Sequence, residues 1–388
     1  MSELNKKFLE ELLAIPTAPF REQTVKGYLF KVLTAQKIAH FEDPSGNIVV
    51  GVKNQKEYLK LVKQKSKDPV RVFMAHLDHP GFHGTKWASQ DVLEATWYGG
   101  SPRAFLEGAE VYVSNGHGIE DRGTILSVEL NKSQSAIAKL KIKVKGVAKK
   151  DTVRAEDLFG AFQFRSHVWK ENQIYYTKAA DDLVGAFSIV TLAKKMKGKP
   201  MIGLLTRAEE VGYIGAIHHF DLGWLKNANR PILCISLETS RTLPGADIGK
   251  GAILRIGDRN TTFDAGALKV FWEMAERKFK GKYQRRIMDG GTCEASVSIA
   301  HGFPTVGISV PLGNYHNQSL EGGPDSRGKD GPAPEFIHED DIQGLLNLCE
   351  GLMDKSLNWS APWKNQLKRF AGLKKEYSKL MRPPKRSF

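Results

Sequence analysis

The sequence predicts an α/β protein with a small β-rich insertion, and three observations lead to this prediction. Apolar runs of strand length alternate with amphipathic runs of helix length near the N-terminus and again in the second half of the chain. Between these parts, short alternating segments are separated by Gly, Asn, Asp and Lys, which is typical of a small antiparallel barrel or sandwich. Acidic residues and histidines directly follow several strand-like runs, where ligands collect in open α/β sheets.

The length of 388 residues favours more than one domain. We expect a discontinuous α/β domain over residues 1–83 and 165–360, whose mixed central sheet is flanked by helices. A barrel-like all-β insert is expected over 84–164. A basic amphipathic tail is expected over 361–388.

The N-terminal part predicts two helices and then two strands. Apolar residues at helical spacing run from Leu4 to Leu13 and end near Pro16, and a second such run extends from Val25 to Leu33. Residues 47–52 and 72–76 are apolar runs of strand length. The second of these strands places His76 at its carboxyl end.

After the insert, the same strand-then-polar pattern repeats four times. The strand at 173–177 leads to paired acids at the start of a helix, and three later strands each lead to one further polar side chain. Helices over 263–279 and 338–355 should cover the sheet. The polar residues that follow the four strands are Asp181, Glu209, Glu238 and His316.

These polar side chains have the chemistry of a site for two divalent cations. Such cations lie about 3.5 to 4 Å apart, share a bridging carboxylate and activate a water molecule between them. Imidazole and carboxylate ligands suit zinc, cobalt and manganese. The candidate ligands are His76, Asp181, Glu210, Glu238 and His316. Glu209 remains free to transfer a proton, and Asp78 could hold the second imidazole nitrogen of His76.

Five motifs carry this site, in the order VFMAHLDHPG (72–81), AADDLVG (179–185), TRAEEVG (206–212), SLET (236–239) and GNYH (313–316). Their order resembles the co-catalytic zinc aminopeptidases that build tetrahedral assemblies, including glutamyl and deblocking aminopeptidases. The resemblance implies a zinc-peptidase catalytic domain, a cis peptide between the paired acids, and a β-rich insert that mediates homo-oligomer assembly. It further implies that His76, Asp181 and Glu238 hold one metal, that Asp181, Glu210 and His316 hold the other, and that Glu209 is the general base.

The chain departs from the family pattern at three positions, and the first of them affects the predicted specificity. Glu238 stands where aminopeptidases of this kind have Asp, while related carboxypeptidases and deacylases commonly have Glu. Glu294, within TCEA, stands near the place of a family Asp, and Leu183 replaces a usual Arg. We therefore predict a dinuclear metal-dependent exopeptidase acting on peptides. Aminopeptidase is the leading function, and carboxypeptidase or N-acyl amidohydrolase is the alternative.

A second alternative is an inactive basic scaffold, because the formal net charge is +14. Much of the excess lies in 139–150 and in the tail, whereas the candidate site segments are acidic, so nucleic acid is not the expected partner. In the tail, apolar residues at helical spacing alternate with Lys and Arg. We expect this helix to pack on the enzyme or on a neighbouring subunit, with an anionic surface as the alternative partner.

Other features restrict the class of protein. His79 and His83 are expected to be loop residues, and His218 and His219 to be packing or surface groups. No glycine motif of a nucleotide-binding loop follows a strand, so a nucleotide cofactor is not expected. Three widely spaced cysteines do not form a disulfide framework. With no apolar leader and no membrane-length apolar run, we expect a cytoplasmic protein.

Overall fold

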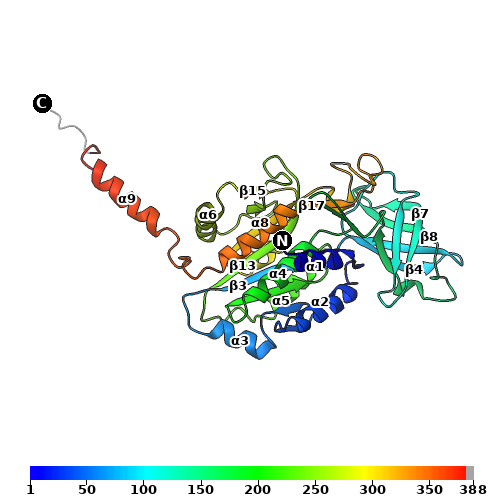
Figure 1. The fold of residues 1–388 in the computed structure, drawn as a ribbon, viewed down its shortest axis with the longest axis horizontal. Helices are drawn as coiled ribbons and strands as arrows, with labels where there is room; N and C mark the ends of the chain where they lie inside the picture. The colour runs from blue at the N-terminus through cyan, green and yellow to red at the C-terminus, as the bar shows by residue number, and fades with distance from the viewer. Residues whose placement is uncertain (382–388) are drawn as a thin grey trace.

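The computed structural model describes residues 1–381, and its main body is built on an eight-stranded mixed sheet (Figure 1). The four central strands, β12, β3, β13 and β16, are parallel, so their carboxyl ends meet at one edge. In spatial order, the strands are β1 (His40–Glu42), β2 (Ile48–Val50), β12 (Met201–Thr206), β3 (Val70–His76), β13 (Ile232–Arg241), β16 (Thr305–Leu312), β14 (Ile253–Asp258) and β15 (Gln284–Met288).

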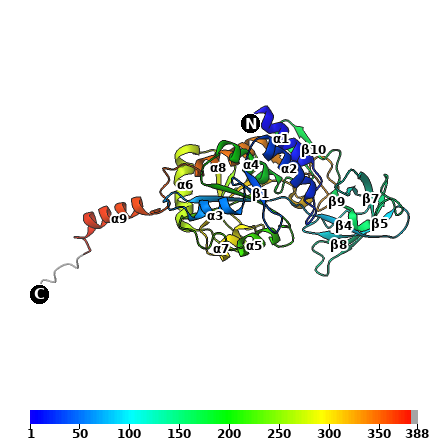
Figure 2. The ribbon, with the colours of Figure 1, turned by 90° about the horizontal axis from the view of Figure 1, so that it is seen from below.

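Helices cover both faces of this sheet, which explains why its central strands are apolar throughout rather than alternating (Figure 2). On β3, Phe73 and Ala75 pack with one helical layer, whereas Val72 and Met74 pack with the other. The first layer contains α1 (Glu3–Ala14), α2 (Gln23–Ala35), α4 (Leu183–Lys195), α6 (Ala265–Phe279) and α8 (Glu339–Leu352). The second contains α3 (Gln55–Lys63), α5 (Ile214–Asp221) and α7 (Ala295–Ala300).

The alternating segments between β3 and β11 form a closed six-stranded barrel beside the main body (Figure 1). Its strands, in order around the barrel, are β4 (Gly81–Trp87), β5 (Val92–Tyr98), β8 (Ile137–Val144), β7 (Glu120–Leu130), β6 (Glu110–Ser114) and β9 (Phe159–Phe162). The barrel has its own apolar core, which includes Phe82, Trp97 and Phe162. Strand β4 begins at Gly81, so the predicted boundary at 84 falls inside the first barrel strand.

A three-stranded antiparallel sheet follows the barrel and consists of β10 (Val168–Glu171), β11 (Ile174–Thr177) and β17 (Glu335–His338). Strand β11 carries the chain from the barrel side back to the paired acids. Strand β17 comes from the C-terminal part of the chain and pairs with it in register from Ile174 to Thr177. The sheet therefore joins two segments of the chain that are distant in sequence.

The predicted tail helix forms, as α9 (Lys364–Tyr377), but it does not pack on the body of its own chain. It extends away from the main body at the end opposite the barrel (Figures 1 and 2), and none of its residues is buried. Of the two expected partners, the body of its own chain does not bury this helix, and packing on a neighbouring subunit stays a prediction. Within residues 1–381, none of the helices combines the length and the apolar character needed to cross a bilayer.

Candidate metal centre

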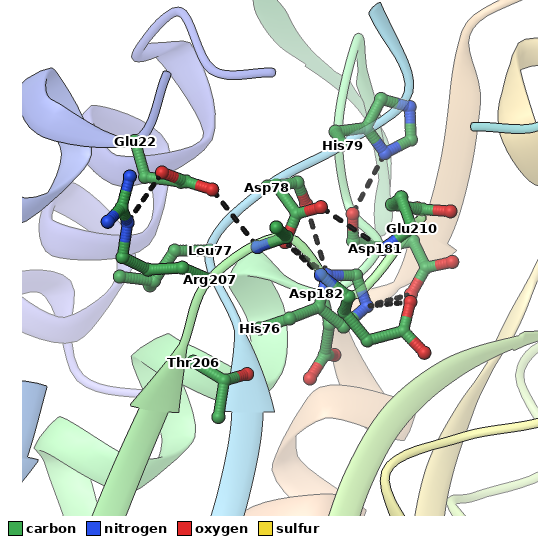
Figure 3. Close-up of polar contacts among 12 residues, drawn as sticks. Glu22, His76, Leu77, Asp78, His79, Asp181, Asp182, Thr206, Arg207 and Glu210 are labelled. Carbon is green, nitrogen blue, oxygen red and sulfur yellow. Dashed lines mark hydrogen bonds and ion pairs between the residues drawn. The ribbon is translucent and has the colours of Figure 1, made fainter. Parts of the chain in front are cut away.

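The candidate site lies at the carboxyl edge of the parallel strands. His76 is the last residue of β3 and lies beside Thr206, the last residue of β12. The loop after β12 brings in Glu209 and Glu210, and the loop after β16 brings in His316. Figure 3 shows His76, at the end of one strand, and Glu210, which follows another, close to Asp181, as expected for a ligand site in an α/β sheet.

Asp181 lies between the two predicted histidine ligands. Its Oδ1 is 3.5 Å from Nε2 of His76, and its Oδ2 is 3.7 Å from Nε2 of His316. Glu210 Oε2 is 3.1 Å from the same His316 nitrogen. One ligand atom each from His76, Asp181 and Glu210 lies within 4.8 Å of the other two. A carboxylate with one oxygen toward each imidazole is placed to bridge two cations.

The second ring nitrogen of His76 is fixed by main chain. Nδ1 donates to the carbonyl oxygen of Asp78 at 3.1 Å, while the nearer Asp78 carboxylate oxygen is 3.7 Å away. Because a carbonyl only accepts, Nδ1 carries a proton, and Nε2, which faces Asp181, is the nitrogen that can bind a cation. Asp78 therefore holds the second imidazole nitrogen of His76, as predicted, but through its main-chain carbonyl rather than through its carboxylate.

The Asp78 carboxylate instead positions the two adjacent glutamates (Figure 3). It accepts hydrogen bonds from the backbone N–H of Glu209 at 2.9 Å and of Glu210 at 3.1 Å. Just before them, Ala208 has a left-handed φ of 53°, and its N–H donates to Glu22 at 3.0 Å. Two buried carboxylates therefore hold a strained turn in one conformation.

Glu238 reaches the site from within a strand rather than from its end. Strand β13 continues to Arg241, three residues past Glu238, so Glu238 lies within the strand that the sequence predicts it to follow. The Glu238 side chain is buried. The next residue, Thr239, donates from Oγ1 to Asp181 Oδ1 at 3.1 Å, which links this strand to the Asp181 carboxylate.

Burial and mutual repulsion shape the electrostatics of this acidic cluster. Burial raises the pKa of Glu209 well above its usual range, and the carboxylates of Glu238 and Glu210 raise it further, whereas His76 opposes them. Burial, with the charge of Asp181 added, likewise raises the pKa of Glu238. Burial lowers the pKa of His76, but Glu209 and Asp181 more than compensate and hold it well above its usual range.

Three buried atoms of the predicted ligands have no hydrogen-bond partner among residues 1–381. They are Oε1 of Glu210, Oε1 of Glu238 and Nε2 of His316, which has only its ion-pair contacts with Glu210 and Asp181. Buried polar atoms are normally hydrogen-bonded, and buried charges are paired or coordinate metals. The donor set of imidazole nitrogen and carboxylate oxygen therefore fits divalent cations such as zinc.

The structure adds Glu335, on β17, which sequence patterns did not reveal. Its carboxylate accepts from the backbone N–H of Ala180 at 2.7 Å, of Asp181 at 3.2 Å and of His316 at 3.0 Å. It joins two ligand segments that lie far apart in sequence. No motif surrounds it, so its role follows only from the pairing of β17 with β11.

The barrel also touches the site through Gly100, in the loop after β5. A Cβ atom on Gly100 would lie 2.0 Å from Nδ1 of His316, so the imidazole packs directly on the glycine backbone. The loop is fixed by Trp97, whose Nε1 donates to the Gly100 carbonyl at 3.0 Å, and by Ser101, which accepts from the N–H of Ile137 at 2.8 Å. The barrel core thus supports a predicted metal ligand.

A cavity lies beside Glu238 and is also lined by Arg255, Tyr315 and Thr292. Arg255, on β14, is only 2% exposed. Its Nε and Nη1 atoms have no hydrogen-bond partner in the part of the chain that the structure describes. A buried guanidinium with free donors in a cavity is suited to bind a carboxylate.

The remaining histidines named in the sequence analysis form hydrogen bonds with groups other than the candidate ligands' side chains, or are exposed. His79 is buried, and its ring nitrogens contact the Asp181 carbonyl at 2.8 Å and Asn317 Oδ1 at 3.2 Å. His83 lies on β4 and donates to the carbonyl of Pro19. His219 is a buried packing residue hydrogen-bonded to Asp43 and Tyr58, as predicted for this pair, and His218 is exposed.

Glu294 is buried, which raises its pKa to about 7. The peptide between Asp181 and Asp182 is cis.

Solved structures with this fold include several peptidases. The TET1 peptidase of Pyrococcus horikoshii, described as assembling into a tetrahedron or a large octahedral shell, has a TM-score of 0.68 at 21% identity, covering 90% of this chain and 99% of its own. An aminopeptidase from the archaeon Desulfurococcus kamchatkensis has a TM-score of 0.71 at 19% identity, covering 91% of this chain and 95% of its own. A TET aminopeptidase from a marine-sediment thaumarchaeon has a TM-score of 0.70 at 18% identity, covering 93% of this chain and 99% of its own. A comparison with curated proteins gave no match.

A protein-family model gives the assignment that these distant structures alone do not. The model described as M42 glutamyl aminopeptidase matches residues 59–320. The matched range is more than half of the chain and contains all the predicted ligands as well as the whole barrel. This protein therefore belongs to the M42 glutamyl aminopeptidase family, whose members are metal-dependent peptidases.

Proposed function

We propose that this chain is a dinuclear metal-dependent aminopeptidase. The observation that carries the proposal is the position of Asp181, which presents one carboxylate oxygen to each of two imidazoles. His76 and Glu238 complete the ligands of one cation, and Glu210 and His316 complete those of the other. Zinc, cobalt and manganese all suit this set. Family membership favours aminopeptidase over the carboxypeptidase, amidohydrolase and inactive-scaffold alternatives.

In this proposal Glu209 is the general base. When bound, a pair of divalent cations lowers the pKa of a water molecule and stabilises negative charge that develops on the scissile carbonyl oxygen. The backbone N–H of Glu209 donates to the Asp78 carboxylate, which fixes the position of Glu209. Oε2 of Glu209 lies 3.8 Å from Nε2 of His76. It can accept a proton from water and deliver it to the departing amine. Asp78 supports this step by fixing the turn.

Arg255 supports a preference for an acidic N-terminal residue. Arg255 lines the cavity beside Glu238, and its guanidinium has two donors without partners within the described chain. A carboxylate of a substrate side chain would satisfy these donors, whereas an apolar side chain would leave them unpaired and buried. The cavity thus favours N-terminal Glu or Asp. Without the Arg255 guanidinium, the negative charge of Glu238 would repel the carboxylate of such a substrate side chain.

The test of the metal and base assignments combines metal analysis with turnover. Metal-free protein titrated with zinc, cobalt or manganese should bind two ions per chain. Glu209→Gln should keep both ions and lose nearly all turnover, about a hundredfold to ten-thousandfold for loss of a general base. Near-normal activity of Glu209→Gln would contradict the base assignment, and fewer than one ion per chain would contradict the dinuclear centre.

The test of specificity is a substrate panel. Peptides with a free N-terminus and a blocked C-terminus should be cleaved, whereas peptides with only a free C-terminus should not. Among free N-termini, Glu and Asp should be preferred over Leu and Lys. Faster cleavage of N-blocked peptides would instead support the carboxypeptidase or deacylase alternative that Glu238 raised.

Two further assignments are part of this proposal. A relative with the same fold is described as forming closed shells, and we expect this chain to form a homo-oligomer through its barrel. Light scattering should then give a mass that is a multiple of the 43.2 kDa chain. The three cysteines are buried and free, which agrees with the expected location in a reducing cytoplasm.

A further inference from the structure

Helix α9 follows a segment that is anchored on α6 and then leaves the enzyme body (Figure 1). The preceding segment is fixed to α6 through Asp354, whose carboxylate accepts from Lys278 at 2.6 Å. Beyond this point, the chain extends outward, and α9 lies at the opposite end of the molecule from the barrel (Figures 1 and 2). The helix buries none of its residues against the described chain.

The exposed helix has two chemically distinct faces. Apolar side chains at three- and four-residue spacing lie along one face, and basic side chains lie along the other. The apolar side chains are 40% to 80% exposed and are Leu367, Phe370, Leu373, Tyr377 and Leu380. The basic row consists of Lys364, Lys368, Lys375 and Lys379.

We propose that α9 docks this enzyme on an anionic lipid surface. A helix with Leu and Phe on one face and Lys on the other lies in the plane of a bilayer interface, with its apolar face at the acyl boundary and its cations at the headgroups. Residues 364–388 contain nine Lys and Arg and a single acid, Glu376. This charge complements phosphate headgroups.

The charge of the rest of the chain argues against a second copy as the occupant of this face. The whole chain has 57 Lys and Arg against 43 acids, so a basic excess remains outside the tail as well. A basic helix is repelled by a like-charged neighbour and attracted by an anionic bilayer. The barrel, through which we propose assembly, lies at the other end and leaves α9 uncovered.

The apolar face argues against a nucleic-acid partner. Binding to phosphodiester backbones requires cations but leaves apolar side chains in water. Here, five large apolar side chains share one continuous face with high exposure. A bilayer interface accommodates both faces of α9 at once.

The test uses the full chain and vesicles of two compositions, phosphatidylcholine alone and phosphatidylcholine mixed with phosphatidylglycerol, in flotation assays. We expect binding only to the mixed vesicles, with weaker binding at high salt. Phe370→Asp places a charge on the apolar face, and the matched Gly372→Asp places the same charge on the polar face, where nothing lies within 4 Å.

Phe370→Asp should weaken binding about tenfold or more, whereas Gly372→Asp should change it by about twofold or less. Peptidase activity without vesicles should be the same in both variants. Equal binding to both vesicle types, or equal effects of the two substitutions, would overturn the proposal. A change in the sedimentation coefficient of Phe370→Asp without lipid would instead identify a second copy, and retained binding of RNA by both variants without vesicle binding would identify nucleic acid.

Discussion

Asp181 is held from several sides, as is usual for a carboxylate ligand, the role that we propose for it. Glu335 fixes its backbone N–H, His79 contacts its carbonyl, and Thr239 donates to its Oδ1. These contacts define the direction of both carboxylate oxygens before any cation binds. Such preorganisation of ligands reduces the conformational cost of metal binding.

Asp78 can be tested separately from the ligands that it supports. Asp78→Ala leaves the N–H groups of Glu209 and Glu210 without their buried acceptor, so the turn should loosen. We expect kcat to fall about 10- to 100-fold, with bound metal nearly unchanged. Asp78→Asn keeps one acceptor and should lie between wild type and Asp78→Ala in a steady-state assay. A selective loss of one ion in Asp78→Ala would contradict this supporting role.

Arg255 provides a second test at a single residue. In Arg255→Met, the cavity loses its cation but keeps an unbranched side chain of similar length. We expect kcat/KM for N-terminal Glu substrates to fall about 10- to 100-fold, because a charged hydrogen bond is lost, and kcat/KM for N-terminal Leu to change little or rise. A parallel loss for both substrates would show that Arg255 acts on the fold instead.

The ligand candidates could be predicted from sequence because each directly follows an apolar strand within a short motif. The supporting residues could not. Glu335 and Arg255 are single polar residues inside strands, and sequence gives no indication of which long-range pairing surrounds them. Glu238 was identified only as part of SLET, while the extension of its strand to Arg241 depends on pairing with β16, which local patterns do not encode.

At the scale of elements, the loop after β5 brings the barrel into contact with His316, a predicted metal ligand. Gly100→Ala should push the His316 ring away, since the added Cβ would lie 2.0 Å from its Nδ1. We expect the affinity for one of the two ions to fall about tenfold or more in calorimetric titration of metal-free protein. Gly27→Ala, in α2 with nothing within 4 Å, is the control and should bind both ions normally.

The outcome of this experiment separates two conclusions. If His316→Ala loses an ion and Gly100→Ala does not, the loop has no positioning role, and the ligand set stands. If neither variant loses an ion, His316 is not a ligand. Sequence predicted the barrel from its alternating segments, but contact between its loop and His316 arises only when the chain returns from β16.

At the scale of the whole molecule, bound cations should contribute to stability. The site gathers several buried carboxylates whose repulsion is relieved when cations bind. At free metal about 100-fold above the dissociation constant, each site adds about 2.7 kcal/mol to the free energy of unfolding. Chelation should therefore lower the unfolding temperature in calorimetry, and His316→Ala should show a smaller decrease. An unfolding temperature that chelator leaves unchanged would show that cations do not bind the folded state selectively.

The position of the barrel within the chain has a consequence for engineering. Its strands are inserted between His76 and Asp181, and its Gly100 loop forms one wall around His316. Shortening the protein by replacing the barrel with a brief linker would keep every predicted ligand yet remove the surface that restrains one of them. A minimal enzyme made in this way should hold one well-ordered ion and one loose one, which would identify this lobe as part of the catalytic unit.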